Sequence, residues 1–217
     1  MRKHIVCLGD SNTHGYCADP SDCGDGGLRF NEDERWTRLL QKALGEEYLV
    51  VEEGLSGRTA VFRDPLNEGM NALDYLYPCL KSHEPVSLLV IMLGTNDTKE
   101  RFGASAAVIA NGMKRLVLKA QSIDCWGGRA PNILIVSPPV IDEKMEQTDV
   151  VSDMGYGCAA KSQGLARYYG EVAALTGVHF LDAEGCEFNK VDFMHFTKKG
   201  HRELAEKLSK LVPKLAK

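Results

Sequence analysis

Short β-rich apolar segments alternate with longer segments of helical periodicity along nearly the whole chain. The segment Leu88-Leu89-Val90-Ile91-Met92-Leu93 is continuously apolar, as expected for a strand that is buried on both faces. Such alternation predicts an α/β fold of three layers, α/β/α, in which helices cover both faces of a five-stranded parallel sheet. We expect the five strands at His4–Leu8, Tyr48–Glu52, Ser87–Met92, Ile133–Val136 and Val178–Leu181.

The helical segments show an apolar face with polar residues elsewhere. In the last one, Leu204, Leu208 and Leu211 share a face, Thr197 is a suitable N-cap, and Pro213 is expected to end the helix. We expect helices at Asp33–Leu44, Asn71–Lys81, Ser105–Gln121, Ala159–Leu175 and Lys198–Val212.

Length and charge limit the classes of protein that this chain can belong to. Its 217 residues fit one domain, residues 1–217, and a net charge of -4 gives no electrostatic reason to expect nucleic acid or an anionic membrane as a partner. No apolar segment approaches the roughly 18 residues needed to span a bilayer. Asp10 also interrupts the first apolar segment too early for a signal peptide, so we expect a cytoplasmic protein. An odd number of cysteines, 7, without a Cys-x-x-Cys pair indicates reduced structural thiols.

Ser11 follows the first predicted strand directly, in the sequence Gly9-Asp10-Ser11. Ligands of open α/β sheets bind at the carboxyl ends of the strands, so a serine there is either a turn residue or a nucleophile. Gly, Asp and Ser are common turn residues, and the motif alone favours a turn. The aperiodic segments 19–30 and 138–157 follow this turn and a later strand, so either can border a site or be a surface loop.

A nucleophilic serine needs a base, and the base needs a group that orients it. Among the 6 histidines, His195 is the best placed, because Asp192 precedes it by three residues just before the last helix. The Asp192 carboxylate can fold back to the His195 Nδ1–H and leave Nε2 free to accept a proton. Alternatively, Asp192 is an acidic residue that precedes a helix, and His195 is a surface histidine. A metal site of Asp192, His195 and His201 is a weaker alternative, because the spacing is loose.

Stabilisation of an oxyanion requires N–H donors near the nucleophile. Asn96, in Gly94-Thr95-Asn96-Asp97, follows the most apolar strand, and its side chain can donate. Gly57 follows the second strand, and a glycine tolerates the backbone angles that point its N–H at a ligand. Taken singly, each segment is equally well read as a tight strand-to-helix turn.

The four blocks together resemble the SGNH hydrolases, also called GDSL esterases/lipases. GDSNTHGY, GLSGRT, GTND and DFMH match the family's blocks in order and spacing over nearly the whole chain. The resemblance implies the flavodoxin-like SGNH hydrolase fold, with Ser11 as nucleophile and Asp192 and His195 completing the triad. It also implies an oxyanion hole formed by the Ser11 and Gly57 N–H groups and the Asn96 side chain, and a reaction that needs neither a cofactor nor a metal.

RWTRLL, EEGLSGRT, DPLNEGMNALDYLYPCLKSHEP and VIMLGTNDTK resemble the arylesterase/acyltransferase branch of this family. The resemblance implies an esterase that acts on short-chain acyl esters such as acetates through an acyl-enzyme, with water or an alcohol as acceptor, in a homo-oligomer. A carbohydrate acetylesterase of the same family and a non-catalytic binding module are the alternatives. We expect Asp10, Asn12 and Thr95 to contact the substrate, with Asn12 in the pocket where the family motif often has Leu.

Overall fold

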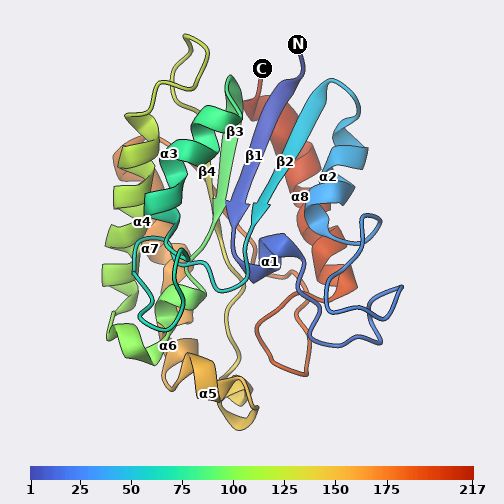
Figure 1. Cartoon of the computed structure of the whole chain (residues 1–217), viewed down its shortest axis with the longest axis vertical. Helices are drawn as coiled ribbons and strands as arrows, with labels where there is room; N and C mark the ends of the chain where they lie inside the picture. Colours follow the sequence, from blue (N-terminus) through green and yellow to red (C-terminus); the bar gives the residue numbers. More distant parts are fainter.

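A computed structural model describes all 217 residues, and its centre is a sheet of five parallel strands in the order β2-β1-β3-β4-β5 (Figure 1). The strands are β1 (Lys3–Gly9), β2 (Tyr48–Gly54), β3 (Val86–Met92), β4 (Ile133–Ser137) and β5 (His179–Asp182). Every predicted strand is present with its ends shifted by no more than two residues. The predicted α/β fold with a five-stranded parallel sheet is therefore confirmed.

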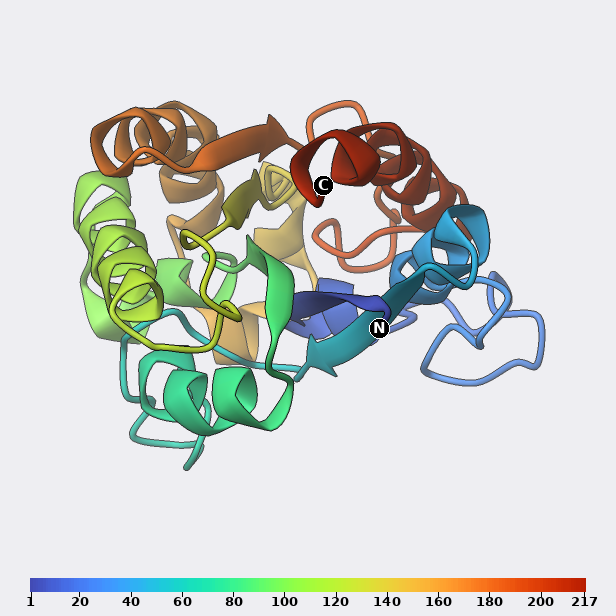
Figure 2. The same cartoon turned by 90° about the horizontal axis from the view of Figure 1, so that it is seen from above.

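Helices cover both faces of the sheet, as the view from above in Figure 2 shows. One face carries α3 (Ala72–Ser82), α4 (Ala106–Gln121) and α7 (Leu165–Thr176), and the other carries α2 (Trp36–Leu44) and α8 (Lys198–Leu215). Successive side chains of a strand point to opposite faces. In β3, Leu89 and Ile91 pack on the α3–α4–α7 side, whereas Leu88 and Val90 pack on the α2–α8 side. The central strand is thus apolar throughout because it has no solvent-facing side.

The helix predicted over 159–175 is two helices, α6 (Cys158–Gln163) and α7, which meet at Gly164. A Cβ on Gly164 would lie 3.0 Å from the Ala106 Cβ at the start of α4, so this junction is a close approach of two elements. The prediction of one continuous helix is wrong here. The apolar pattern continues across Gly164, and the sequence does not show that α4 packs closely against this glycine.

Pro213 does not end the last helix, contrary to the prediction. The helix α8 continues to Leu215, and the Ala216 N–H donates to the Val212 carbonyl at 2.8 Å. A proline removes its own N–H from the helix but leaves the following residues able to bond. The start of α8 is as predicted, with the Thr197 side chain accepting from the Gly200 N–H at 3.1 Å. The first predicted helix begins three residues late, at Trp36, after an extended Arg35.

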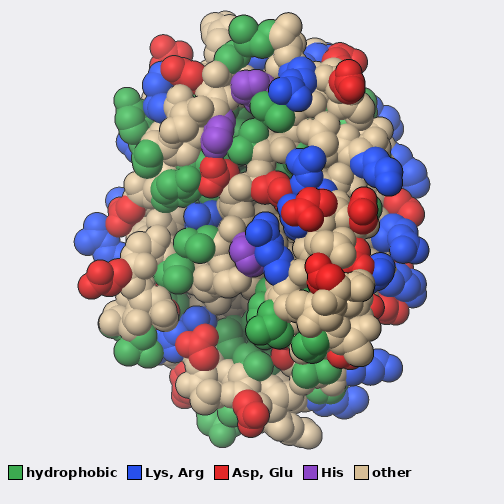
Figure 3. Space-filling model, turned by 45° about the vertical axis from the view of Figure 1, so that its right-hand side comes forward, with side chains coloured by type: hydrophobic (Ala, Val, Ile, Leu, Met, Phe, Trp, Pro, Cys, Tyr) green, Lys and Arg blue, Asp and Glu red, His purple; other side chains and the backbone are tan.

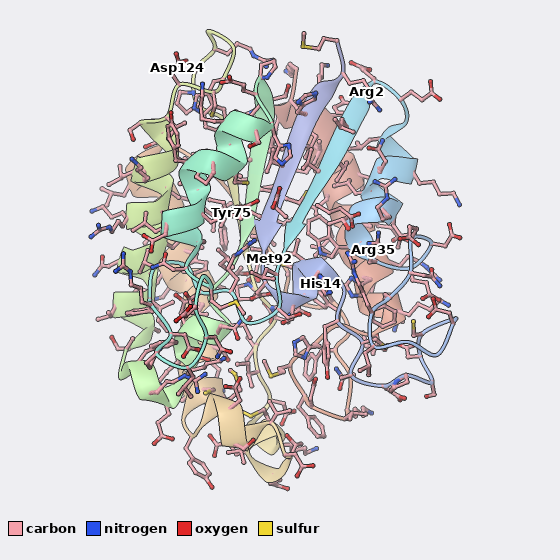
Figure 4. All side chains as sticks on the ribbon, viewed as in Figure 1. Arg2, His14, Arg35, Tyr75, Met92 and Asp124 are labelled. Carbon is pink, nitrogen blue, oxygen red and sulfur yellow. The ribbon has the colours of Figure 1, made fainter.

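Short helices occupy the turns at the carboxyl edge of the sheet. They are α1 (Ser11–His14), η1 (Asn96–Thr98), η2 (Glu100–Phe102), η3 (Glu143–Gln147) and α5 (Val151–Met154). The last two lie within the aperiodic segment 138–157. In Figure 4, the labelled residues Met92 and His14 lie at this carboxyl edge, and Arg2 and Asp124 lie near the opposite edge of the sheet.

Charged side chains of both signs are interspersed on the face drawn in Figure 3, so no patch of a single sign dominates it. No helix is both long enough and apolar enough to cross a bilayer. All 7 cysteines are buried and have free thiols.

Candidate active site

Ser11 lies where β1 ends and the one-turn helix α1 begins. The Asp10 side chain caps this helix by accepting from the Asn12 N–H at 3.0 Å. The turn is tight, since a Cβ on Gly9 would lie 2.0 Å from the Thr13 hydroxyl. This turn holds the Ser11 hydroxyl at the carboxyl edge of the sheet.

Three side chains that are far apart in the sequence form one hydrogen-bonded chain. The Ser11 Oγ lies 2.7 Å from the His195 Nε2, and the His195 Nδ1 lies 2.7 Å from the Asp192 Oδ2. All three residues are buried. A hydroxyl bonded to an imidazole whose other nitrogen meets a carboxylate is the arrangement that activates a nucleophile.

The loop that carries this histidine is shaped by two polar side chains. Asp192 Oδ1 accepts from the Met194 N–H at 3.1 Å, the His195 N–H at 3.2 Å and the Asn189 Nδ2 at 2.9 Å. Asn189 in turn accepts from the Asp192 N–H at 2.9 Å. Phe193 has φ of 61°, a left-handed conformation that is unusual for a bulky residue and is held by these bonds. Asn189 is not among the predicted site residues, although an Asn three residues before the Asp is a signal for such a turn.

The environment keeps Asp192 ionised. Burial alone would raise the pKa of Asp192, but hydrogen bonds from His195 and Asn189 and the charge of His195 outweigh it and hold the pKa below its ordinary value. The Tyr16 ring packs against the His195 ring, with centroids 4.7 Å apart, and covers it from one side. Burial raises the pKa of Tyr16, so its hydroxyl remains protonated at neutral pH.

Two further predicted residues, Asn96 and Gly57, lie at the same site. The Asn96 Nδ2 donates one hydrogen bond to the Arg58 carbonyl at 3.2 Å, and an amide nitrogen has a second N–H to offer. Gly57 has φ of 87°, a conformation that favours glycine. Both line a pocket of about 280 Å³ together with Ser11 and His195. The remaining residues that line it are Tyr16, Ser56, Val150, Asp153, Met154, Asp192 and Met194.

One wall of this pocket is α5, from the segment 138–157, and sequence reasoning did not identify its residues. Asp153 connects this short helix to the body of the protein: its Oδ2 lies 2.8 Å from the Lys99 Nζ and its Oδ1 lies 2.6 Å from an Arg101 nitrogen. Lys99 is almost completely buried, at 2% exposure. The segment 138–157 thus borders the site, whereas no residue of 19–30 lines the pocket.

Asp10, Asn12 and Thr95 do not line the pocket, contrary to the expectation that they contact substrate. Each is only about 1% exposed. Asp10 caps α1 instead, and burial raises the pKa of its carboxyl to about 6. The Asn12 side chain is bonded to the backbone of the His195 loop. These three side chains therefore face the protein interior, whereas those of Ser11 and Asn96, in the same turns, line the pocket.

His201 is separate from the hydrogen-bonded chain. Its Nδ1 accepts from the Trp36 N–H at 3.3 Å, and burial lowers its pKa to about 3. No three His, Cys, Asp or Glu side chains in the structure are grouped as metal ligands, so the alternative site of Asp192, His195 and His201 is not formed.

Residues 7–203 match the model of the GDSL-like lipase/acylhydrolase family. Among solved structures, the inhibitor-bound aryl esterase of M. smegmatis is 36% identical, with 98% of this chain and 99% of that chain covered and a TM-score of 0.86. A carbohydrate acetylesterase from Sinorhizobium meliloti is 32% identical, with 99% and 100% covered and a TM-score of 0.85. No protein with a curated description matches the sequence. The sheet, the site geometry and the match over most of its length together show that this chain belongs to the GDSL-like lipase/acylhydrolase family, that is, the SGNH hydrolases.

Proposed function

We propose that this protein is a serine esterase that cleaves short-chain acyl esters through an acyl-enzyme. The observation that carries the proposal is the continuous chain of hydrogen bonds from Ser11 through His195 to Asp192, which opens on the pocket. Family membership supports the reaction class, because the family comprises lipases and acylhydrolases.

Acylation begins when His195 Nε2 accepts the Ser11 proton and Ser11 Oγ bonds to the ester carbonyl carbon. The carbonyl oxygen becomes an oxyanion, which the N–H groups of Ser11 and Gly57 and the Asn96 Nδ2 stabilise. Asp192 orients the imidazole and stabilises its protonated form. The carbon–oxygen bond to the leaving group then breaks, and His195 gives its proton to the departing alcohol.

Deacylation repeats these steps with a second nucleophile. A water molecule gives its proton to His195 and attacks the acyl carbon, which releases the acid and restores the Ser11 hydroxyl. An alcohol that enters in place of water yields a new ester by the same route. Every step uses groups of this chain, so the proposed reaction requires no cofactor.

The size and lining of the pocket favour small acyl groups. Its volume of about 280 Å³ falls just below the range of about 300–1,000 Å³ that is usual for sites holding drug-sized ligands. Val150, Met154 and Met194 supply its apolar lining. The proposed substrates are therefore esters smaller than a drug-sized ligand, such as acetates.

A carbohydrate acetylesterase is the second candidate, favoured by the similarity to the protein from Sinorhizobium meliloti. A panel of p-nitrophenyl esters of increasing chain length and of acetylated xylosides distinguishes the two. We expect the highest kcat/KM with p-nitrophenyl acetate, and faster turnover of the acetylated xylosides would instead support the second candidate.

The same panel, repeated with an added alcohol, measures how much of the acyl group is transferred rather than hydrolysed. Ser11→Ala is the control and should turn over none of the substrates. Retained turnover by this variant would contradict the proposal, and a lack of labelling by a fluorophosphonate would favour a non-catalytic binding module.

A further inference from the structure

Asn12 is adjacent to the proposed nucleophile in sequence, yet its side chain is bonded to the opposite side of the site. The Asn12 Oδ1 accepts from the Phe196 N–H at 2.9 Å, and its Nδ2 donates to the Met194 carbonyl at 3.4 Å. These two backbone groups flank His195. A single buried carboxamide thus bridges the peptide groups on both sides of the imidazole-bearing residue.

The backbone of Asn12 is itself anchored on the nucleophile side. Its N–H donates to the Asp10 carboxylate at 3.0 Å, and its carbonyl accepts from the Trp36 Nε1 at 3.0 Å. The bridge to the His195 loop therefore starts from a fixed point one residue after Ser11.

The other hydrogen bonds of the loop backbone do not connect it to the residues next to Ser11: the Phe193 carbonyl, for example, accepts from the Asp142 N–H at 3.1 Å. Asn189 and Asp192 bond to backbone and side chains within the same loop, so they determine its internal shape. They do not determine how far the loop lies from Ser11. The Asn12 carboxamide does, because it connects the two segments directly, 184 residues apart at Phe196.

We propose that Asn12 is a positioning residue that holds His195 within hydrogen-bonding distance of Ser11. The inference rests on the proposed function, since it assigns Asn12 a role in presenting the base. A carboxamide carries a donor and an acceptor at one end, as this bridge requires. A carboxylate at position 12 keeps the acceptor and loses the donor. A leucine, similar in size, has neither, and leaves the Phe196 N–H and the Met194 carbonyl buried without this partner.

The test compares Asn12→Leu and Asn12→Asp with the unaltered protein in p-nitrophenyl acetate hydrolysis. A misplacement of about 1 Å at a catalytic group can lower a rate about 100-fold, so we expect a loss of kcat of that order for Asn12→Leu. Asn12→Asp keeps the bond from Phe196 and should lose less. KM should change by no more than about twofold, because Asn12 does not line the pocket.

Asn132→Asp is the matched control. The Asn132 Nδ2 donates to two carbonyls, at 2.8 Å and 3.0 Å, just before β4 and so at the edge of the sheet remote from the pocket. This variant should lower the unfolding temperature and leave kcat unchanged. A loss of kcat in the Asn12 variants beyond that of the control is therefore not explained by a general loss of stability.

The rate of Ser11 labelling by a fluorophosphonate separates this inference from the proposed function. If the unaltered protein is not labelled, the proposed function fails whatever the Asn12 variants do. If it is labelled but Asn12→Leu reacts at the same rate, the positioning role alone is wrong. A raised KM with unchanged kcat would also overturn it, since that result means a substrate contact. If Asn12→Leu does not fold, the same outcomes are read from Asn12→Asp.

Discussion

Replacing Asp192 with Asn changes one atom type in the hydrogen-bonded chain and leaves its shape intact. In the structure, Asp192 Oδ1 accepts from three N–H groups of its own loop, and Oδ2 faces the His195 Nδ1 at 2.7 Å. The single oxygen of an Asn side chain is needed at the Oδ1 position, where three donors converge. The amide NH2 must then occupy the Oδ2 position and face His195.

This orientation reverses the tautomer of the imidazole. Nδ1 has to accept from the amide, so the proton moves to Nε2, the nitrogen that faces Ser11 Oγ at 2.7 Å. A protonated Nε2 in a neutral imidazole cannot accept the serine proton. The corresponding substitution in a well-known serine protease triad keeps the geometry and lowers kcat about 10⁴-fold. We expect a similar loss here, equivalent to about 5 kcal/mol of transition-state stabilisation.

The assay is the steady-state hydrolysis of p-nitrophenyl acetate at neutral pH, with unfolding temperatures measured alongside. Asp182→Asn is the matched control: Asp182 Oδ1 also accepts hydrogen bonds, from the Ser137 hydroxyl at 2.6 Å and the Glu184 N–H at 2.9 Å, but it does not line the pocket. Its kcat should be unchanged. An Asp192→Asn variant that is folded and retains most of its kcat, or loses activity through KM alone, would refute the assignment.

Other residues give separate expectations. Asn96→Ala should lower kcat about 100-fold in the same assay, because one oxyanion donor is lost; an effect on KM alone would identify Asn96 as a substrate contact. Lys99→Met removes a buried cation that holds Asp153 on α5. The pocket wall formed by α5 should become less ordered, and KM should rise more than kcat falls. Unchanged kinetics would show that α5 does not need this ion pair. Burial, with the nearby Asp10 charge, raises the pKa of Asp97 to about 7, so the folded chain binds this proton more tightly than the unfolded chain. Its contribution to stability is therefore complete below about pH 4 and lost as the pH rises through about 7, at most about 1.4 kcal/mol per unit of pKa shift. The free energy of unfolding in urea is measured for the unaltered protein and for Asp97→Asn at about pH 5 and about pH 8. From the lower to the higher pH, the unaltered protein should lose stability relative to the variant. A difference in free energy that is the same at both pH values would contradict the raised pKa.

The strands and most helix ends could be predicted from the sequence because they depend on local patterns. The apolar segment at 88–93 and the cap at Thr197 are visible within a few residues. Pro213 does not end a helix as the sequence predicts, and Gly164 divides a segment for which the sequence predicts one continuous helix. The helix continues past Pro213 because later residues still form hydrogen bonds, and Gly164 lies against Ala106 of α4. Neither feature can be recognised from the neighbouring sequence alone.

The candidate site shows the same division. Ser11, Asn96, Asp192 and His195 follow strands or precede a helix in recognisable motifs, and the structure brings them together. Whether a neighbouring side chain faces the pocket or the interior could not be predicted, and the three expected substrate contacts next to these motifs proved to be buried.

Other parts of the site depend on contacts between distant segments. The ion pair between Lys99 and Asp153 joins two segments that are far apart in the sequence, and no sequence motif in either segment predicts it. The hydrogen bond between Asn12 and Phe196 joins residues that are 184 positions apart in the sequence. Such contacts are determined only when the whole chain has folded.

Trapping the acyl-enzyme tests directly whether Ser11 is the nucleophile. The protein is mixed with p-nitrophenyl acetate, quenched in acid within the first turnover, digested and analysed by mass spectrometry. We expect one acetyl group on the peptide that contains Ser11, formed together with a burst of p-nitrophenol, and no adduct or burst with Ser11→Ala. Steady turnover with the acetyl group on another residue, or undiminished turnover by Ser11→Ala, would show that Ser11 is not the nucleophile.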